Sequence, residues 1–425
     1  MVKIKSFIKN NQLVKNIGFL AGGTALAQLI TFIVTIYLTR MYLPENFGIL
    51  SLLTSIVSLL APVSSLRYDK AIILSEDERE FKSLLYLSGA INIILFFVLF
   101  IAGLALWCFS DYLGLNSYKS LFWIIPCSVL FFGFASTFQS YNEKLSKFKL
   151  TASISLVDAS VKSFLQYVLY GFLPKMGLLL GYLGALFTNF MVYFFNFLSN
   201  KKEKTLKVTT KDLKFVSKKY NKFPKYFAWS NMIDSASQNI CAITFPFFFS
   251  LHILGNFSIA FKVVRLPAML ISMATRRVYY PKAAGLFVND KANFFKLYKK
   301  STITLILISI IPVILLEFLI PNIFTLFFDK NWMSSIPYAQ IILVYVFFNF
   351  VNSLAHENML IFGLQRAFLI IEVIWIVLSV LLIYVAYLCN DAILAVVFYV
   401  LSGVIMEITI FIIQYKKGKT LNDLS

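Results

Sequence analysis

The chain has 425 residues, of which 59% are hydrophobic and only 14% are charged. Soluble domains are about 45–50% apolar and about 25% charged, so this composition excludes an ordinary soluble protein. Lys and Arg number 39 against 20 Asp and Glu, which gives a net charge of +19. The aromatic residues lie inside apolar runs and not between the cations, so no stacking surface for nucleic acid is visible and no nucleic acid partner is expected.

The apolar residues come in runs of about 20, the length that a helix needs to cross roughly 30 Å of hydrocarbon. We therefore expect an all-α polytopic membrane protein with about twelve transmembrane helices. In chain order, the predicted spans are residues 17–38, 47–66, 83–107, 119–138, 151–173, 177–198, 226–249, 257–277, 302–325, 336–356, 367–388 and 391–414.

The distribution of cations predicts the orientation of these spans. Residues 1–15 are basic and the run after them is long enough to span, so no cleavable signal is expected. Of the 39 Lys and Arg residues, 32 fall in segments on one side, four on the other and three inside spans. Because cytoplasmic segments carry the excess of Lys and Arg, both termini are expected on the cytoplasmic side of a bacterial inner membrane.

The longest connection, residues 201–225, holds ten Lys and no Arg between the sixth and seventh spans. We interpret it as a basic cytoplasmic linker between an N-terminal six-helix bundle, residues 1–200, and a C-terminal one, residues 226–425. Its charge would also attract anionic lipid, at about 1 kcal/mol per cation near the surface. The positive-inside bias alone accounts for the same charge.

Two stretches of the chain read alike, Leu43–Lys70 and Ile253–Tyr280. Each lies at the second span of a six-span half, so the copies run parallel, as in transporters built from internal repeats. At an offset of 210 residues, the identical positions are Asn46 and Asn256, Phe47 and Phe257, and Arg67 and Arg277.

The second copy carries two cations, Lys262 and Arg265, where the first has Leu52 and Ser55. Three residues apart, they share one helix face. Arg265 lies about 13 Å along its span, near the midplane, where an ionisable residue costs roughly 2.5–3.5 kcal/mol and usually faces a cavity or a partner. A diphosphate is the anion that suits two such cations. Pairing with a buried acid such as Asp234 is the alternative.

Further cations and acids of the spans are weaker candidates. Arg67 and Arg277 end the two repeat copies at the cytoplasmic side, where they could bind head-group phosphates or serve as ordinary anchors. Asp158 and Lys162 are four apart and would form a self-neutralising pair. Glu357 lies beside His356 near a cytoplasmic helix end, where solvation is the simpler account. The candidates for a coupling proton or Na⁺ are Asp158, Asp234, Glu317, Glu372 and Glu407. No catalytic residue is assigned. The four scattered cysteines indicate neither a disulfide framework nor a metal site.

The sequence resembles the polysaccharide transporters of the multidrug/oligosaccharidyl-lipid/polysaccharide exporter superfamily, especially the bacterial O-antigen and capsule repeat-unit flippases. The resemblance covers most of the chain, through the twelve-span layout together with four stretches. These are Asn16–Leu52, the segment Arg67–Leu74 (RYDKAIIL), Lys219–Ile240 with its Phe-Pro, and Leu254–Phe287 with Pro267 and Pro281.

This resemblance implies two six-helix bundles around a central cleft that opens alternately to each side. It implies as substrate an oligosaccharide linked by diphosphate to undecaprenol, moved from the cytoplasmic to the periplasmic leaflet for O-antigen or another surface polysaccharide. It places Lys262 and Arg265 on the span that carries cleft cations in relatives. It further suggests a polysaccharide polymerase and a chain-length regulator as partners, and no cofactor beyond a coupling H⁺ or Na⁺.

Three alternative functions were weighed. A lipid II flippase and a multidrug antiporter of the same superfamily share the fold, but the first span lacks the charges that some of them place there. A membrane polymerase or glycosyltransferase would be an enzyme of different class. Such enzymes use a sizeable external loop, whereas the external loops here are about ten residues long, so no enzyme is expected.

Overall fold

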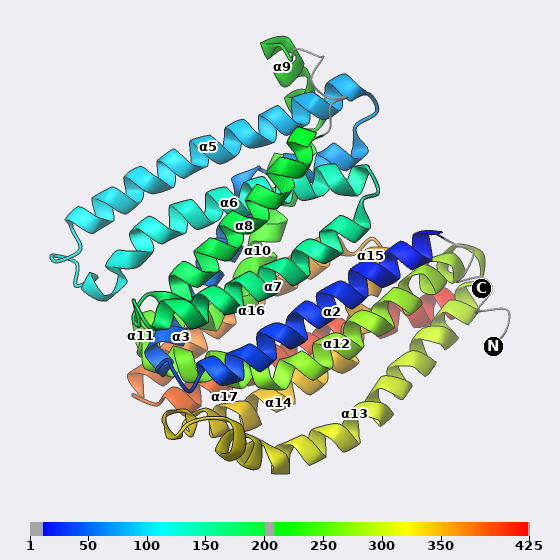
Figure 1. Ribbon diagram of the computed structural model, residues 1–425. Coiled ribbons are helices and arrows are strands. Elements are labelled where there is room, and N and C mark those ends of the chain that lie inside the picture. Colours follow the sequence, from blue (N-terminus) through cyan, green and yellow to red (C-terminus); the bar gives the residue numbers. More distant parts are fainter. Residues whose placement is uncertain (1–11, 200–207, 424–425) are drawn as a thin grey trace. The chain divides into compact units, whose positions relative to one another are not determined.

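The structure is a computed structural model that describes residues 12–199 and 208–423 (Figure 1). Within these ranges the chain is helical and contains no strand. The predicted all-α polytopic membrane fold is confirmed. The chain divides into two compact units: unit 1 comprises Met1–Tyr42 and Leu52–Ser235, and unit 2 comprises Leu43–Ser51 and Ala236–Ser425.

Unit 1 is a bundle in which α2 packs on α7, α7 and α6 both pack on α8, and α5 packs on α6. A short amphipathic helix, α9, lies against α5. The helices are α2 (Gln12–Leu38), most of α3 (Pro44–Ser64), α4 (Tyr68–Ala71), η1 (Ile72–Leu74), α5 (Glu78–Cys108), η2 (Asn116–Tyr118), α6 (Lys119–Lys144), α7 (Phe148–Tyr170), α8 (Gly177–Ser199), α9 (Thr210–Lys219), the π-helical turn η4 (Phe223–Phe227) and the larger part of α10 (Ala228–Gln238).

Unit 2 is built around α14, which packs on α12, α13 and α17, while α16 packs on α17 and α11. The first residues of α3, from Leu43 to Ser51, belong to this unit. Its further helices are α11 (Ile240–Phe248), α12 (Leu251–Asn289), α13 (Lys291–Phe327), η5 (Lys330–Trp332), α14 (Ser335–Val351), α15 (Ser353–Ile361), α16 (Gln365–Leu388) and α17 (Ala392–Asp423).

Each of the twelve predicted spans falls on one helix or on two consecutive helices. Among the described residues, nine segments are long and apolar enough to cross a membrane. The other three predicted spans fall on α2, on α7 and on α10 with α11. The described apolar part of α2 is short, α7 carries Asp158 and Lys162, and the seventh span is interrupted at Asn239.

The helices extend beyond the eighth and ninth predicted spans. The polar residues between these spans are helical as well: α12 is 39 residues long, α13 is 37 residues long, and only Asp290 separates them. Hydropathy detects only the apolar part of a helix, whereas polar residues with good helix propensity extend it. Asp290 begins α13 because its side chain accepts a hydrogen bond from the Asn293 amide at 3.0 Å.

Two predicted spans are broken near their middle by an asparagine. Asn239 separates α10 from α11, and Asn352 separates α14 from α15. Asn352 has φ −86° and ψ 2°, in the bridge region of backbone space. The main chain stays hydrogen-bonded at Asn352, since its N–H donates to the Phe348 carbonyl at 2.9 Å and its carbonyl accepts from Ala355 and His356. Interrupted helices form substrate and ion sites in transporters. The linker region is only partly described: residues 201–207 of the predicted 201–225 linker lie outside the described residues, as do residues 1–11 of the predicted cytoplasmic N-terminus.

The two repeat copies contact each other inside unit 2, through glycines. A Cβ on Gly48 would lie 2.0 Å from the carbonyl oxygen of Leu251, and a Cβ on Gly255 would lie 1.9 Å from that of Pro44. Phe47 packs edge-on against the buried ring of Trp332, with centroids 5.2 Å apart. Small residues at a helix crossing let backbones approach closely, which is the main source of helix association in lipid.

This crossing predicts a stability difference between two glycines of the same helix. Gly255→Ala would drive a methyl group into the Pro44 carbonyl and should cost about 1–3 kcal/mol as an overpacked substitution. Gly285→Ala, with nothing within 4 Å, should leave stability unchanged or slightly higher. Thermal unfolding of the purified protein in detergent measures both. Equal unfolding midpoints for the two variants would contradict the close crossing.

Candidate functional site

The two predicted diphosphate-binding cations near the midplane, Lys262 and Arg265, lie on α12, one turn apart and half-buried. The guanidinium of Arg265 lies over the ring of Phe261, 5.2 Å from its centroid. Within the described chain, no carboxylate oxygen lies within 4.0 Å of Arg265. Lys262 takes part in an interaction of its own. Nothing tests the phosphate role, which stays a prediction.

Two prolines weaken the helices in this region, one on the helix that carries the cations and one on the next helix. Pro267 of α12 and Pro312 of α13 both lie inside helices, where each removes one backbone hydrogen bond. Both prolines line an apolar hollow of about 90 Å³ between α12, α13 and α14. Arg265 lies two residues before Pro267, so a bend at the proline would move the guanidinium.

Arg67 occupies a strained turn in unit 1. Leu66 and Arg67 have φ values of 48° and 60°, both in the left-handed region that non-glycine residues rarely adopt. A terminal guanidinium nitrogen of Arg67 donates to Asn231 Oδ1 at 2.9 Å. The Nε of Arg67 is buried without a hydrogen-bond partner in the described part of the chain. Backbone outliers persist where surrounding contacts hold them, and they concentrate at functional sites.

Asp69 explains how the Arg67 turn is held. Its carboxylate is 1% exposed and accepts hydrogen bonds from Ser65 Oγ at 2.6 Å and Ser136 Oγ at 2.8 Å. Lys70 Nζ lies 4.0 Å from it and also donates to Ser140. A buried carboxylate is stable only when hydroxyls and a cation satisfy it, so these contacts fix the turn on α6.

Arg277 is half-buried on α12, twelve residues beyond Arg265, which is about 18 Å along a helix. Its neighbour Arg276 lies 3.8 Å from Glu357 of α15. The expectation of a merely solvated Glu357 was therefore wrong, because α12 packs on α15 at this point. Arg67 belongs to unit 1, whereas Lys262, Arg265 and Arg277 belong to unit 2.

Among the five coupling-ion candidates, Glu407 of α17 has the most complete set of partners. It is 1% exposed and accepts hydrogen bonds from Asn349 Nδ2 and Asn352 Nδ2, each at 2.7 Å. His356 Nε2 lies 3.1 Å from the same carboxylate. The imidazole ring of His356 therefore faces Glu407, and it packs edge-on against Phe368.

The other four candidates have fewer partners. Glu372 of α16 is buried and accepts a long hydrogen bond from Ser237 at 3.4 Å. Asp158 accepts from Asn189 of α8 at 2.7 Å. No ion pair within 4.0 Å joins it to Lys162 in the described structure, so the predicted i,i+4 pair was wrong. Asp234 interacts with a neighbouring group, and Glu317 is half-buried on α13.

The sequence analysis overlooked the polar residues that complete these sites. Asn349, Asn352 and His356 stand at i, i+3 and i+7 of an otherwise apolar span, a spacing that places them on one helix face. That spacing was the signal, and it points at the Glu407 carboxylate. Asn231 and Ser136 offered no such pattern, because each contacts a residue far away in sequence.

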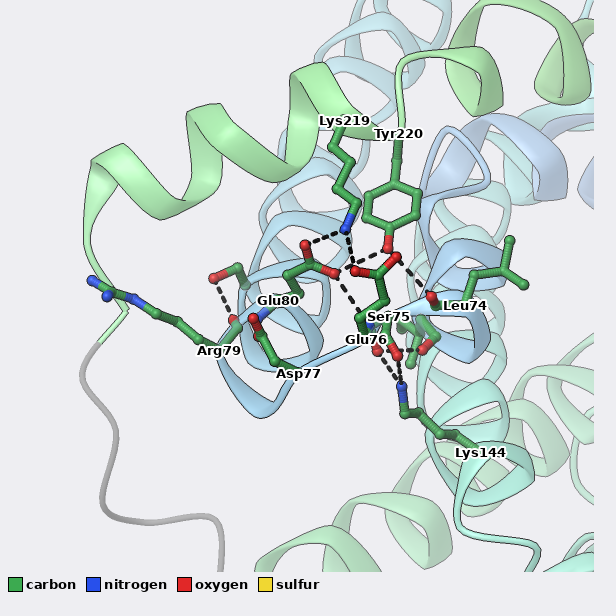
Figure 2. A network of polar contacts seen from close by, with 11 residues as sticks. Leu74, Ser75, Glu76, Asp77, Arg79, Glu80, Lys144, Lys219 and Tyr220 are labelled. Carbon is green, nitrogen blue, oxygen red and sulfur yellow. Dashed lines mark hydrogen bonds and ion pairs between the residues drawn. The ribbon is translucent and has the colours of Figure 1, made fainter.

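A second polar network closes one end of unit 1 (Figure 2). Lys219 Nζ lies 2.5 Å from Glu80 Oε1 and 3.2 Å from Glu76 Oε2. The hydroxyl of Tyr220 lies 3.1 Å from Glu80 Oε2, and Lys144 Nζ donates to the Ser75 carbonyl at 2.5 Å. The hydrogen bond to Glu80 raises the pKa of Lys219. These contacts fasten α9 to the start of α5.

The Lys219 contacts predict how firmly α9 is attached. Lys219→Met should release the end of α9 and increase amide hydrogen exchange across Thr210–Lys219, because Glu80 and Glu76 lose their common cation. Lys218→Met, one residue away and exposed, removes the same charge without a described contact and is the matched control. If both variants exchange like the unmodified protein, the network does not hold α9.

The start of α9 predicts an effect of pH. Thr209 and Asp212 form a capping box, and hydrogen bonds from Thr209 lower the pKa of Asp212 below its ordinary value of 3.8. A lowered pKa in the folded state stabilises the helix fully above pH 3.8 and loses this effect as pH falls through the lower value. A spin label on α9 should therefore stay immobile from neutral pH to about pH 4 and become mobile below. In Asp212→Asn the mobility should not follow this titration.

Comparison with known proteins identifies the fold. The family model described as "Polysaccharide biosynthesis protein" matches residues 37–337. No curated protein matches the chain. The solved structure of the lipid II flippase MurJ, in an inward closed conformation, is similar with a TM-score of 0.70 and 13% identity, over 95% of this chain and 89% of that one.

Two multidrug transporters share the fold. An inward-facing MATE family transporter of the MOP superfamily is similar with a TM-score of 0.66 and 11% identity, over 96% of this chain and 95% of that one. A mutant of the Vibrio cholerae MATE transporter VcmN gives a TM-score of 0.58 and 10% identity, over 95% and 96%. The resemblance to the polysaccharide transporters of this superfamily, predicted from the sequence, is confirmed.

Proposed function

The chain belongs to this family of polysaccharide biosynthesis proteins, and on that premise we propose that it is a flippase for undecaprenyl-diphosphate-linked oligosaccharides. It moves single repeat units of an O-antigen or another surface polysaccharide from the cytoplasmic to the periplasmic leaflet. It resides in the inner membrane of a bacterium, with both termini in the cytoplasm. It acts by alternating access and catalyses no covalent step.

One observation supports an anionic head group above the others: two half-buried cations one turn apart in the middle of α12. Arg265 is held over Phe261 and has no carboxylate within 4.0 Å in the described structure. A buried cation is costly unless something offsets the cost. A diphosphate offers several charged oxygens. An Arg can bind two of them at once through parallel hydrogen bonds, and a Lys binds them as a compact point charge.

The proposed cycle uses Lys262 and Arg265 for capture. The diphosphate reaches them from the cytoplasmic side, with Arg67 and Arg277 as earlier contacts for phosphate. The sugars remain hydrated and the prenyl chain stays in the bilayer. Bending of α12 at Pro267 then carries the bound head group toward the other leaflet. A proton or Na⁺ drives the return, and a polymerase and a chain-length regulator use the product.

This function predicts the effect of removing the two cations. Lys262→Gln combined with Arg265→Gln should abolish surface polysaccharide, because charge-assisted hydrogen bonds contribute roughly 1.5–3 kcal/mol each and about 1.4 kcal/mol is tenfold. Lipid-linked repeat units should accumulate in the inner leaflet. The measurement is glycan display per amount of protein in the membrane, in cells that depend on this chain.

Lys282→Gln is the matched control, since it removes an exposed cation from the same helix. Normal glycan display in the double variant would refute the head-group role. Growth of cells depleted of their own lipid II flippase, when they express this chain, would instead establish lipid II as substrate. Increased drug sensitivity with intact glycan after deletion would establish a multidrug antiporter.

A further inference from the structure

The polar site around Glu407 is unusual for the interior of a membrane bundle. Glu407 of α17 meets Asn349 at the end of α14, Asn352 in the break and His356 on α15. Asn352 Nδ2 also donates to the Glu407 carbonyl at 2.9 Å. Intramembrane ionisable residues are expensive and generally functional. Three contacts to the carboxylate and one to its backbone carbonyl, all from one interrupted helix, make a built site.

The charged surroundings of Glu407 are limited to one partner. His356 is its ion-pair partner, and the Tyr345 hydroxyl of α14 interacts with it electrostatically. Of the other helices packed on α17, α16 carries Glu372 and α13 carries Glu317. Neither has a described hydrogen bond to Glu407, and Glu372 instead accepts from Ser237. Among the described ion pairs, His356 is thus the partner that can exchange a proton with Glu407.

The chemistry of the site suits a proton better than a metal cation. Hard cations such as Mg²⁺ or Ca²⁺ need a shell of oxygen ligands. Here the carboxylate oxygens face two amide N–H donors and an imidazole nitrogen. These donors occupy the lone pairs that a metal ion would need. A proton needs only one oxygen and one acceptor for the new O–H.

That acceptor is present at Asn352. Its Oδ1 is buried with no hydrogen-bond partner in the described structure, although the residue is only 4% exposed. Rotation of the amide by half a turn would exchange its nitrogen for this oxygen. In the present orientation Asn352 donates to the carboxylate, and in the rotated one it would accept from the carboxylic acid.

We propose that His356, Glu407 and Asn352 form a proton-binding site whose occupancy is transmitted to the break between α14 and α15. His356 is 19% exposed and Glu407 1%, so the proton enters on the imidazole. Its N–H bond breaks as the O–H bond of Glu407 forms, and the imidazole returns to neutral. The Asn352 amide rotates to accept the new O–H. Because Asn352 is the residue of the break, the two forms place α15 differently.

The binding step can be tested without any substrate, by infrared difference spectroscopy of the protein in nanodiscs between pH 5 and 9. One buried carboxylic acid band should appear as pH falls. This band should be absent in Glu407→Gln and should persist in Glu357→Gln, which changes the residue next to His356 on α15. His356→Gln should shift the pH of its appearance by at least one unit, a tenfold change in proton concentration. An unchanged spectrum in Glu407→Gln would overturn the proposal.

The transmission step has its own readout. After correction for intrinsic rates, amide hydrogen exchange at residues 352–357 should depend on pH in the unmodified protein. It should not depend on pH in Glu407→Gln or in Asn352→Leu. Retained pH dependence in both would refute the link to the break. The use of this proton in transport rests on the proposed function, but these two measurements do not. Normal glycan display in the Lys262 and Arg265 double variant would refute the proposed function but would not affect the proposed proton site.

Discussion

Every polar group inside a bilayer must find its partner within the protein, and this constraint underlies the whole structure. It explains why the described chain is helical, since a helix satisfies its own backbone. It also explains the smaller contacts along the spans. The hydroxyls of Thr31 and Thr35 donate to carbonyls four residues earlier, and Asp69 draws on two serines. Glu407 is the extreme case, a fully buried carboxylate satisfied by three side chains.

Places where the constraint is not fully met indicate function. Arg67 Nε and Asn352 Oδ1 are buried without partners in the described structure, and both belong to irregular backbone. One lies in a left-handed turn and the other in a helix break. Unsatisfied atoms at such points are strained positions that a ligand, a proton or a conformational change can relieve.

The sequence was sufficient for the fold class and for most helices, because hydrophobic runs report directly on membrane burial. It was insufficient where helices continue through polar sequence, as in α12 beyond Arg276. It also overestimated local pairing: Asp158 prefers Asn189 over Lys162 because a neighbouring helix offers a better-placed amide. Glu407 was recognised as one acid among five. No role was predicted for its partner His356, since nothing local shows that α15 packs against α17. Contacts between helices that are distant in sequence decide such roles, and these contacts cannot be recognised from a single sequence.

The glycine crossing between α3 and α12 makes the two copies of the repeat unequal. In the register of the repeat, Gly48 corresponds to Ser258 and Gly255 corresponds to Glu45. Each copy therefore has a glycine where the other has a larger side chain, and the crossing has no room for a side chain at either glycine. A chain with the residues of one copy in both places could not make this crossing. The crossing therefore needs one glycine from each copy, and the two copies are not interchangeable at these positions.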